Sequence, residues 1–388
     1  MASLLRSVVG AVLVSSILAC AGFDAQPLPP GEPVAETLPR LEPVLQPIRT
    51  KHALPAAAGA IFDSSGQLLA VGAVGQRHLD VGDGPSEPVT VRDRWHLGSD
   101  TKAMTATLVA RAVERGELDF DTPVSELMPA ADPAWQSVTV KHLLSHTGGV
   151  QDGFPTTFIT MKYRYGFERA AEGRAVWMAD LVSEPPSGEL GSHEYSNLGY
   201  ILAGHLLEQQ QGRPWEELIH DQLFEPLGMT SSDFGPPRGP HPWGHGEFGS
   251  ELTAIEPSIH GDNAGALGPA GTVHAPLSDW AKFGALHLAA ARGQPELVSQ
   301  EVFTTLHTPV EQGYALGWGA VEDEDFGGAW ILSHSGSNMF WYARIVLVPD
   351  HDRGYLFVTN TARHGREAAA EAIQALAAVT LPEQAVAD

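Results

Sequence analysis

The sequence predicts an α+β fold, an α/β sandwich in which one antiparallel sheet is flanked by helices. Strand-like patterns occur near both ends of the chain, while helical periodicity dominates the region between them. Strands so far apart in sequence can share one sheet only if the intervening chain forms an insertion. Within a domain at 45–385, we therefore expect a sheet part at about 45–125 and 270–385 and an inserted, mostly helical subdomain at about 126–269.

The strand-like stretches are bounded by turn signals. Near the N-terminus, A-G-A-I-F-D and L-L-A-V-G-A-V-G flank the glycine-containing loop S-S-G-Q, which predicts a β-hairpin over 57–75. Near the C-terminus, four such stretches follow one another: 316–321, 329–338, 342–349 and 355–360. A last helix is expected at about 366–378.

Between these ends, helices are expected where apolar residues recur at helical spacing beside a cap or a glycine stop. The clearest candidates are 139–149, 194–214, 214–227 and a helix capped near Ser278. Two segments lack such a period. Residues 151–174 are aromatic and irregular, which favours a surface loop or a lid, and residues 234–268 are rich in Gly, Pro and His, which favours a loop.

Composition places the chain among globular enzymes. Its 388 residues are 43% hydrophobic and 18% charged, enough for a sizeable core. The formal net charge is -24, from 23 basic and 47 acidic residues. Such a chain has no basic surplus to neutralise phosphates, so we expect no nucleic-acid partner.

The N-terminus has the pattern of an export signal. Arg6 precedes a small and apolar run, Ser7 to Ala19, which is too short for a membrane-spanning helix but typical of a signal peptide at 1–19. The following residue, Cys20, completes I-L-A-C, which resembles a bacterial lipobox. Cys20 is the sole cysteine, so no intramolecular disulfide can form.

This pattern predicts an exported cell-envelope lipoprotein, periplasmic or outer-membrane anchored, that meets the membrane through a lipid on Cys20. The alternative is an ordinary secretory signal and a freely secreted protein. Residues 20–44 are rich in Pro, Gly, Ala and Glu without a hydrophobic period, and they are interpreted as a flexible tether.

The central motif is S-D-T-K at Ser99. Apolar residues at helical spacing follow it, with Ser99 or Asp100 as the expected N-cap and Gly116 as the stop. Ser99 and Lys102 are three apart and therefore share a helix face. A serine needs an adjacent base, and a lysine can serve if burial lowers its pKa. S-x-x-K occurs by chance in many proteins, so the motif alone favours a capping serine and a solvated lysine.

Two further motifs support a catalytic interpretation of S-D-T-K. Tyr195 and Asn197 stand at the start of an expected helix in Y-S-N, and His334 opens H-S-G on an expected strand. Individually these are compatible with a core aromatic, a cap and an edge-strand residue.

His142 and His146 are four apart, but the zinc-protease pattern would need Glu where Leu143 stands, so no metal site is expected.

With these three motifs in this order, the chain resembles the serine β-lactamase and penicillin-binding-protein superfamily, in the branch of class C β-lactamases, D-aminopeptidases and esterases. The resemblance covers about residues 50–380. It includes the flanking patterns H-L-L-S-H-T-G-G, Y-S-N-L-G-Y and F-E-P-L-G-M.

The resemblance implies a role for each motif. Ser99 would be the acylated nucleophile and Lys102 its proton partner, while Tyr195 would act with Lys102 as general base and leaving-group acid, with a phenolate as one option. Asn197 would orient Lys102 and a substrate carbonyl. The backbone N–H groups of Ser99 and of the residue after H-S-G would form the oxyanion hole.

In H-S-G, His334 would stand where class C enzymes carry the lysine of K-T-G. Gly336 would give the backbone room to approach a ligand, and Ser337 would supply the second oxyanion N–H. A histidine is largely neutral near pH 7 and would hold a substrate carboxylate poorly. The resemblance therefore implies an esterase-like serine hydrolase acting on a small ester, amide or peptide without metal or cofactor. The alternatives are a β-lactamase or D-amino-acid peptidase, and a non-catalytic penicillin-binding-like sensor.

Overall fold

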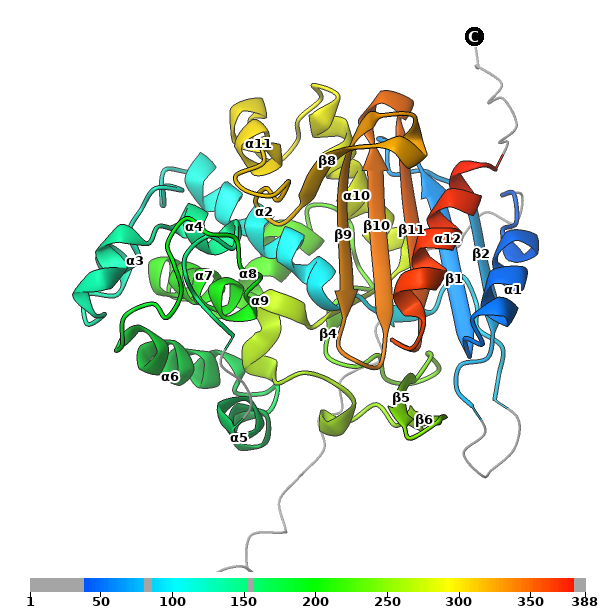
Figure 1. Cartoon of the computed structure of the whole chain (residues 1–388), viewed down its shortest axis with the longest axis horizontal. Helices are drawn as coiled ribbons and strands as arrows, with labels where there is room; N and C mark the ends of the chain where they lie inside the picture. The colour runs from blue at the N-terminus through cyan, green and yellow to red at the C-terminus, as the bar shows by residue number, and fades with distance from the viewer. Residues whose placement is uncertain (1–37, 80–85, 153–155, 380–388) are drawn as a thin grey trace, which may run out of the picture.

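The computed structural model describes residues 38–79, 86–152 and 156–379 (Figure 1). Its main sheet has six strands in the order β2-β1-β11-β10-β9-β8, and every neighbouring pair is antiparallel. The strands are β1 (Ala56–Phe62), β2 (Leu68–Gly75), β8 (Gly319–Asp323), β9 (Ala329–Ser337), β10 (Tyr342–Val348) and β11 (Arg353–Thr359).

The N-terminal hairpin joins the C-terminal strands through the pairing of β1 with β11, in which Ala57 lies opposite Thr359. The predicted fold class, one antiparallel sheet built from both ends of the chain, is therefore confirmed. Its strands carry apolar side chains on both faces because helices cover both sides of the sheet.

The two faces of the sheet are covered by different helices. Helix α12 (Gly365–Ala377) and helix α1 (Glu42–Lys51) pack on one face, and α10 (Leu277–Ala291) packs on the other (Figure 1). The ordered domain begins before the expected tether end at residue 44, because Leu41 is buried and α1 starts at Glu42. Prolines in this stretch suggested a tether, but a proline in the first turn of a helix costs no hydrogen bond.

Helix α2 (Thr101–Glu114) runs between the sheet and the helical part (Figure 1). Eleven of its 14 residues are buried, so it is a central helix rather than the amphipathic one expected. Its threonines are accommodated by internal hydrogen bonds, such as Thr105 Oγ1 to the Pro269 carbonyl at 2.7 Å. Because α2 is buried, the residues at its N-terminus are held in fixed positions.

Most of the remaining helices lie in the helical part, while α11 lies near the C-terminal strands. These remaining helices are α3 (Val124–Leu127), α4 (Val140–Leu144), α5 (Thr156–Tyr165), α6 (Ala170–Val182), α7 (Asn197–Gln211), α8 (Trp215–Ile219), α9 (Gly268–Gly271) and α11 (Gln300–His307). Among the described residues, no helix is both long and apolar enough to cross a membrane.

Two segments expected to be loops contain regular structure. Within 151–174, α5 and the start of α6 form a helical pair; aromatic residues hid α5, and Gly173 lies inside α6 where it makes room for the ring of Tyr165. Within 234–268, β5 (Gly244–Phe248) and β6 (Glu251–Ile255) form a hairpin. The strand period there is obscured by glycines, whose backbone pairs without a side-chain pattern.

Candidate active site

Ser99 lies on a 3-10 turn at Gly98–Asp100, between the short strand β3 (Arg94–His96) and α2. Asp100 occupies the N-cap position of α2, but its side chain makes no capping hydrogen bond, so the expected side-chain cap is wrong. The Ser99 hydroxyl instead accepts a hydrogen bond from Lys102 Nζ at 3.0 Å, as the three-residue spacing predicts.

Lys102 is completely buried, and three neutral oxygens surround its amine. Besides Ser99, Lys102 Nζ donates to Asn197 Oδ1 at 2.7 Å and to the Ala270 carbonyl at 2.7 Å. Burial lowers the pKa of Lys102 to about 7, although the carboxylates of Asp152 and Asp100 act to raise it. Near neutral pH a large fraction of Lys102 is thus an uncharged amine beside Ser99, able to accept its proton.

Tyr195 also contacts the nucleophile. Its hydroxyl forms a hydrogen bond with Ser99, and Lys102 Nζ lies 4.9 Å from the centre of its ring. Although 42% of the residue is exposed, its hydroxyl end is enclosed, and this loss of solvent raises the pKa of Tyr195 above its usual value near 10. The phenolate option is therefore disfavoured, and Tyr195 retains a proton that it can donate.

Asn197 begins α7 and is held by Asp152, a residue that sequence reasoning missed. Asp152 Oδ2 accepts from Asn197 Nδ2 at 2.8 Å and from its backbone N at 3.0 Å, while Oδ1 accepts from the Leu198 N at 2.9 Å. The carboxylate therefore lies at the positive N-terminal end of α7. Because the Asn197 amide group is fixed in this way, its oxygen points at Lys102.

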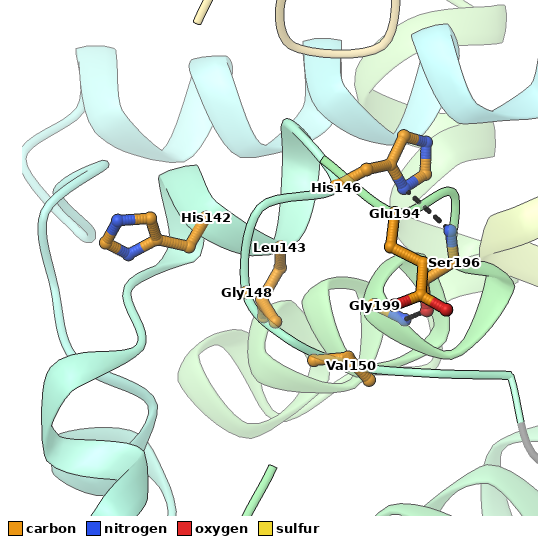
Figure 2. A pocket seen from close by; sticks show the side chains of 8 residues that line it. All are labelled: His142, Leu143, His146, Gly148, Val150, Glu194, Ser196 and Gly199. Atoms are coloured by element: carbon orange, nitrogen blue, oxygen red, sulfur yellow. Dashed lines mark hydrogen bonds between the residues drawn. The ribbon is translucent and has the colours of Figure 1, made fainter. Parts of the chain in front are cut away.

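His146 supports the same helix start from the neighbouring loop. Its Nδ1 accepts a hydrogen bond from the Ser196 backbone N at 3.0 Å, as Figure 2 shows, and its ring lies 4.4 Å from that of Tyr195. Burial lowers the pKa of His146 well below 6.5, and the nearby Lys102 lowers it further. His146 is therefore a neutral acceptor that helps to place Tyr195.

Gly336 and Ser337, at the end of β9, pack directly against the Ser99 turn. A Cβ on Gly336 would lie 1.9 Å from the Leu97 carbonyl oxygen and 2.6 Å from Ser99 N, so the approach requires glycine. Gly98 has a φ of 53°, and a Cβ at this position would lie 2.4 Å from Ser337 N. The two backbone amides expected in the oxyanion hole, Ser99 N and Ser337 N, thus belong to segments in direct contact.

His334 lies behind this contact and does not present a charge to solvent. Its Nε2 is 3.1 Å from the Tyr314 hydroxyl, and its Nδ1 is 3.8 Å from Asp100 Oδ1, too far for a hydrogen bond. Burial lowers the pKa of His334 to about 3, and Lys102 lowers it further. Burial also raises the pKa of the Asp100 carboxyl well above 3.8. The imidazole is therefore neutral.

No group of three or more His, Cys, Asp or Glu side chains suited to a metal ion occurs among residues 38–79, 86–152 and 156–379. His142 instead bonds Thr139 in a capping box, and His146 bonds Ser196. Cys20, the expected lipidation site, lies outside the described residues.

The structure thus brings Ser99, Lys102, Tyr195 and Asn197 together, with Gly336 and Ser337 beside them. The supporting residues have no pattern in the sequence: Asp152 follows a glycine-rich turn, and Tyr314 lies in a loop before β8. For His146, four residues after His142, the sequence favours a helix-face or capping histidine and does not indicate its bond to Ser196. Their roles depend on contacts between segments distant in sequence, which no local spacing encodes.

Comparison with known proteins places the chain in a family. The sequence matches the Beta-lactamase family over residues 41–380. It is 29% identical to penicillin-binding protein 4 of Amycolatopsis lactamdurans over 323 residues, 77% of this chain and 79% of that protein. It is 26% identical to the lovastatin esterase of Penicillium rubens over 225 residues, 54% of this chain and 53% of that protein.

Solved structures share the fold. The octameric penicillin-binding protein homologue from Pyrococcus abyssi aligns with a TM-score of 0.71 at 24% identity, over 87% of this chain and 76% of that one. A class C β-lactamase from Rhodobacter sphaeroides aligns with a TM-score of 0.65 at 21% identity, over 86% and 97% respectively. The chain is therefore a member of the β-lactamase family and a serine hydrolase.

Proposed function

We propose that this protein hydrolyses small esters through an acyl-Ser99 intermediate, with amides as slower substrates. The observation that carries the proposal is the buried Lys102 amine, 3.0 Å from Ser99 Oγ, with a pKa lowered to about 7. A lysine in this state is matched to its task, because general bases work best with a pKa near the operating pH.

In acylation, the neutral Lys102 amine takes the proton of Ser99 as Oγ attacks the substrate carbonyl. The carbonyl oxygen becomes an oxyanion, which the N–H groups of Ser99 and Ser337 stabilise. When the carbonyl re-forms, the bond to the leaving group breaks, and Tyr195 donates its proton to that group. Proton transfer from Lys102 to the phenolate restores both residues. Water then attacks the acyl group by the reverse of the same transfers.

A substrate without a carboxylate suits this site. His334 stands where class C enzymes carry the lysine of K-T-G, and its imidazole is buried and neutral. Lys102 is itself enclosed, and the carboxylate of Asp152 lies nearby. A neutral ester avoids the cost of placing a further anion there.

The second candidate is a β-lactamase or D-amino-acid peptidase. The similarity to penicillin-binding protein 4 over 77% of the chain favours it. It uses the same acyl-enzyme chemistry, so only the substrate distinguishes it from the esterase. A non-catalytic sensor would have no chemical need for Ser99, Lys102 and Tyr195 together.

The test compares initial rates on a short-chain p-nitrophenyl ester and on a chromogenic cephalosporin, with Ser99→Ala as the control. Ester turnover that disappears in Ser99→Ala, with little cephalosporin turnover, is the expected result. Rapid cephalosporin turnover would establish the second candidate instead. If neither substrate turns over and Ser99 is not acylated, the sensor reading replaces both.

We also propose that the protein is exported and anchored through a lipid on Cys20. The proposal rests on the I-L-A-C pattern after the apolar run. Metabolic labelling with a radioactive fatty acid in a bacterial host is expected to mark the full-length protein but not Cys20→Ser. Equal labelling of both, or of neither, contradicts lipidation at Cys20.

A further inference from the structure

One buried carboxylate connects the two segments that carry the proposed oxyanion amides. Asp262 follows the 3-10 turn Ile259–Gly261 of the helical insertion and is only 2% exposed. It accepts hydrogen bonds from His96 Nε2 at 2.8 Å and from Asn338 Nδ2 at 2.9 Å. None of these three residues takes part in the proton transfers proposed above.

The first connection leads to the nucleophile turn. The Gly98 backbone N donates to His96 Nδ1 at 3.0 Å, so in the neutral ring the proton is on Nε2, where it is donated to Asp262. Asp262 therefore fixes the tautomer and orientation of His96. Through His96 it holds Gly98, the residue directly before Ser99.

The second connection leads to the turn after β9. Asn338 directly follows Ser337, and its Oδ1 accepts from the Phe340 backbone N at 3.2 Å while its Nδ2 donates to Asp262. The intervening Met339 has a φ of 76°, in the left-handed region that is unfavourable for a side chain of this kind. The bonds of Asn338 hold the chain in this conformation.

We infer that Asp262 is a positioning residue that fixes the distance between the two oxyanion amides, Ser99 N and Ser337 N. The inference rests on the proposed function, because only an acyl transfer requires both amides. Each connection ends one residue from an amide, on opposite sides of the hole. Since such donors stabilise the transition state through preset geometry, Asp262 contributes to turnover rather than to substrate binding.

The test is Asp262→Asn in the full-length protein. The asparagine side chain keeps the shape of the aspartate and one of its two oxygens. Its NH2 group, however, faces one of the two donors, His96 Nε2 or Asn338 Nδ2, and cannot accept a hydrogen bond from it. We expect kcat for the p-nitrophenyl ester to fall by about 100-fold, as displacements of this kind do, with KM within about threefold. Affinity for an arylboronic acid, which forms a tetrahedral adduct with Ser99, should fall by the same factor as kcat.

Asp279→Asn is the matched control. Asp279 is an equally buried carboxylate on α10 that accepts from the Ser231 backbone N at 2.7 Å. We expect it to lower thermal stability without changing kcat or the boronic-acid affinity. A kinetic loss equal to that of Asp262→Asn would reduce the role of Asp262 to general stability.

Asn338→Ala removes only the connection from Asp262 to the turn after β9. It tests the inference in case Asp262→Asn does not fold. It should reproduce the loss of kcat and of boronic-acid affinity, and the double variant should lose less than the product of the two single effects. Wild-type boronic-acid affinity in a folded Asp262→Asn or Asn338→Ala protein overturns the inference. Failure of the proposed function is distinct, since the wild-type protein would then show no ester turnover, or turnover that Ser99→Ala leaves unchanged.

Discussion

Lys102 and Arg174 are both fully buried basic residues, but their partners differ in charge. Lys102 donates to three neutral oxygens, those of Ser99, Asn197 and Ala270. Arg174 donates instead to two carboxylates, Glu208 at 2.7 Å and Glu216 at 2.8 Å. The same burial therefore has opposite consequences for the two groups.

Burial lowers the pKa of Lys102 to about 7, because its hydrogen-bond acceptors carry no charge to offset the lost solvent. Burial acts in the same direction on Arg174, but the carboxylates of Glu216 and Glu208 outweigh it and raise its pKa. Arg174 is thus a permanent charge that joins α6, α7 and α8, whereas Lys102 can exchange a proton. The comparison distinguishes a structural cation from a reactive one.

The largest expected effect comes from Lys102→Met. This change removes the amine but keeps an unbranched apolar side chain in the cavity. We expect ester turnover to fall by at least about 10³-fold, since general-base assistance is lost. Thermal denaturation should show a folded protein. Turnover within tenfold of wild type would mean that Lys102 is not the base.

Arg174→Met should have the reverse effect. It leaves the Glu208 carboxylate, with a 7% exposed side chain, without its buried counter-charge. We expect unfolding free energy, measured in urea, to fall by about 3–5 kcal/mol, while kcat of the folded fraction stays unchanged. A selective loss of kcat at unchanged stability would contradict the structural role.

A further test uses acid stability. His287 Nδ1 lies 2.9 Å from His307 Nε2, and Thr107 Oγ1, which donates to the Ala103 carbonyl, lies 3.0 Å from His287 Nε2. Burial lowers the pKa of His287 well below 6.5 and that of His307 to about 3, so both rings are neutral in the folded protein. The unfolded state therefore binds more protons in acid.

It follows that the contribution of this pair to stability is fully present above pH 6.5 and is lost as the pH falls below that value. The slope is about 1.4 kcal/mol per pH unit for each proton. Urea denaturation of His307→Gln between pH 4 and 7 should show a shallower decline than wild type. Parallel declines would contradict the assignment.

The smallest expected effect is that of Asp152→Asn. Asp152 raises the pKa of Lys102, so its neutralisation should move the acid limb of kcat/KM toward lower pH. Turnover should fall as well, because Asn197 loses part of its support. An acid limb of kcat/KM displaced toward higher pH would contradict a negative charge of Asp152 beside Lys102. Glu194→Gln, a change at a more exposed carboxylate beside Tyr195, serves as the control and should leave the limb in place.

The sheet and the reactive pair were predictable because both have local signatures. The hairpin over 57–75 and the C-terminal strands carry turn residues at regular intervals, and the S-D-T-K spacing places Lys102 beside Ser99 on any helix. The β5–β6 hairpin was missed because glycines leave no alternation to detect. Helix α5 was missed because aromatic and β-branched residues weaken the helical pattern.

The supporting shell of the site was not predictable for a different reason. Asp152, Asp262 and Tyr314 act through contacts with residues that lie between 20 and 166 positions away in the sequence. The protonation state of Tyr195 likewise stays open in the sequence, because it depends on solvent excluded by the assembled fold. The sequence identifies which groups can react, and the packing decides their proton states.

The most direct test of the central claim is the pH dependence of Ser99 modification by a fluorophosphonate probe. This reaction reports activation of the nucleophile without requiring the natural substrate. The rate should rise with pH through an apparent pKa of about 7, the value for Lys102, and should be nearly abolished in Lys102→Met. A rate that is independent of pH between 5 and 9, or that persists in Lys102→Met, would contradict the role of Lys102 as the base for Ser99.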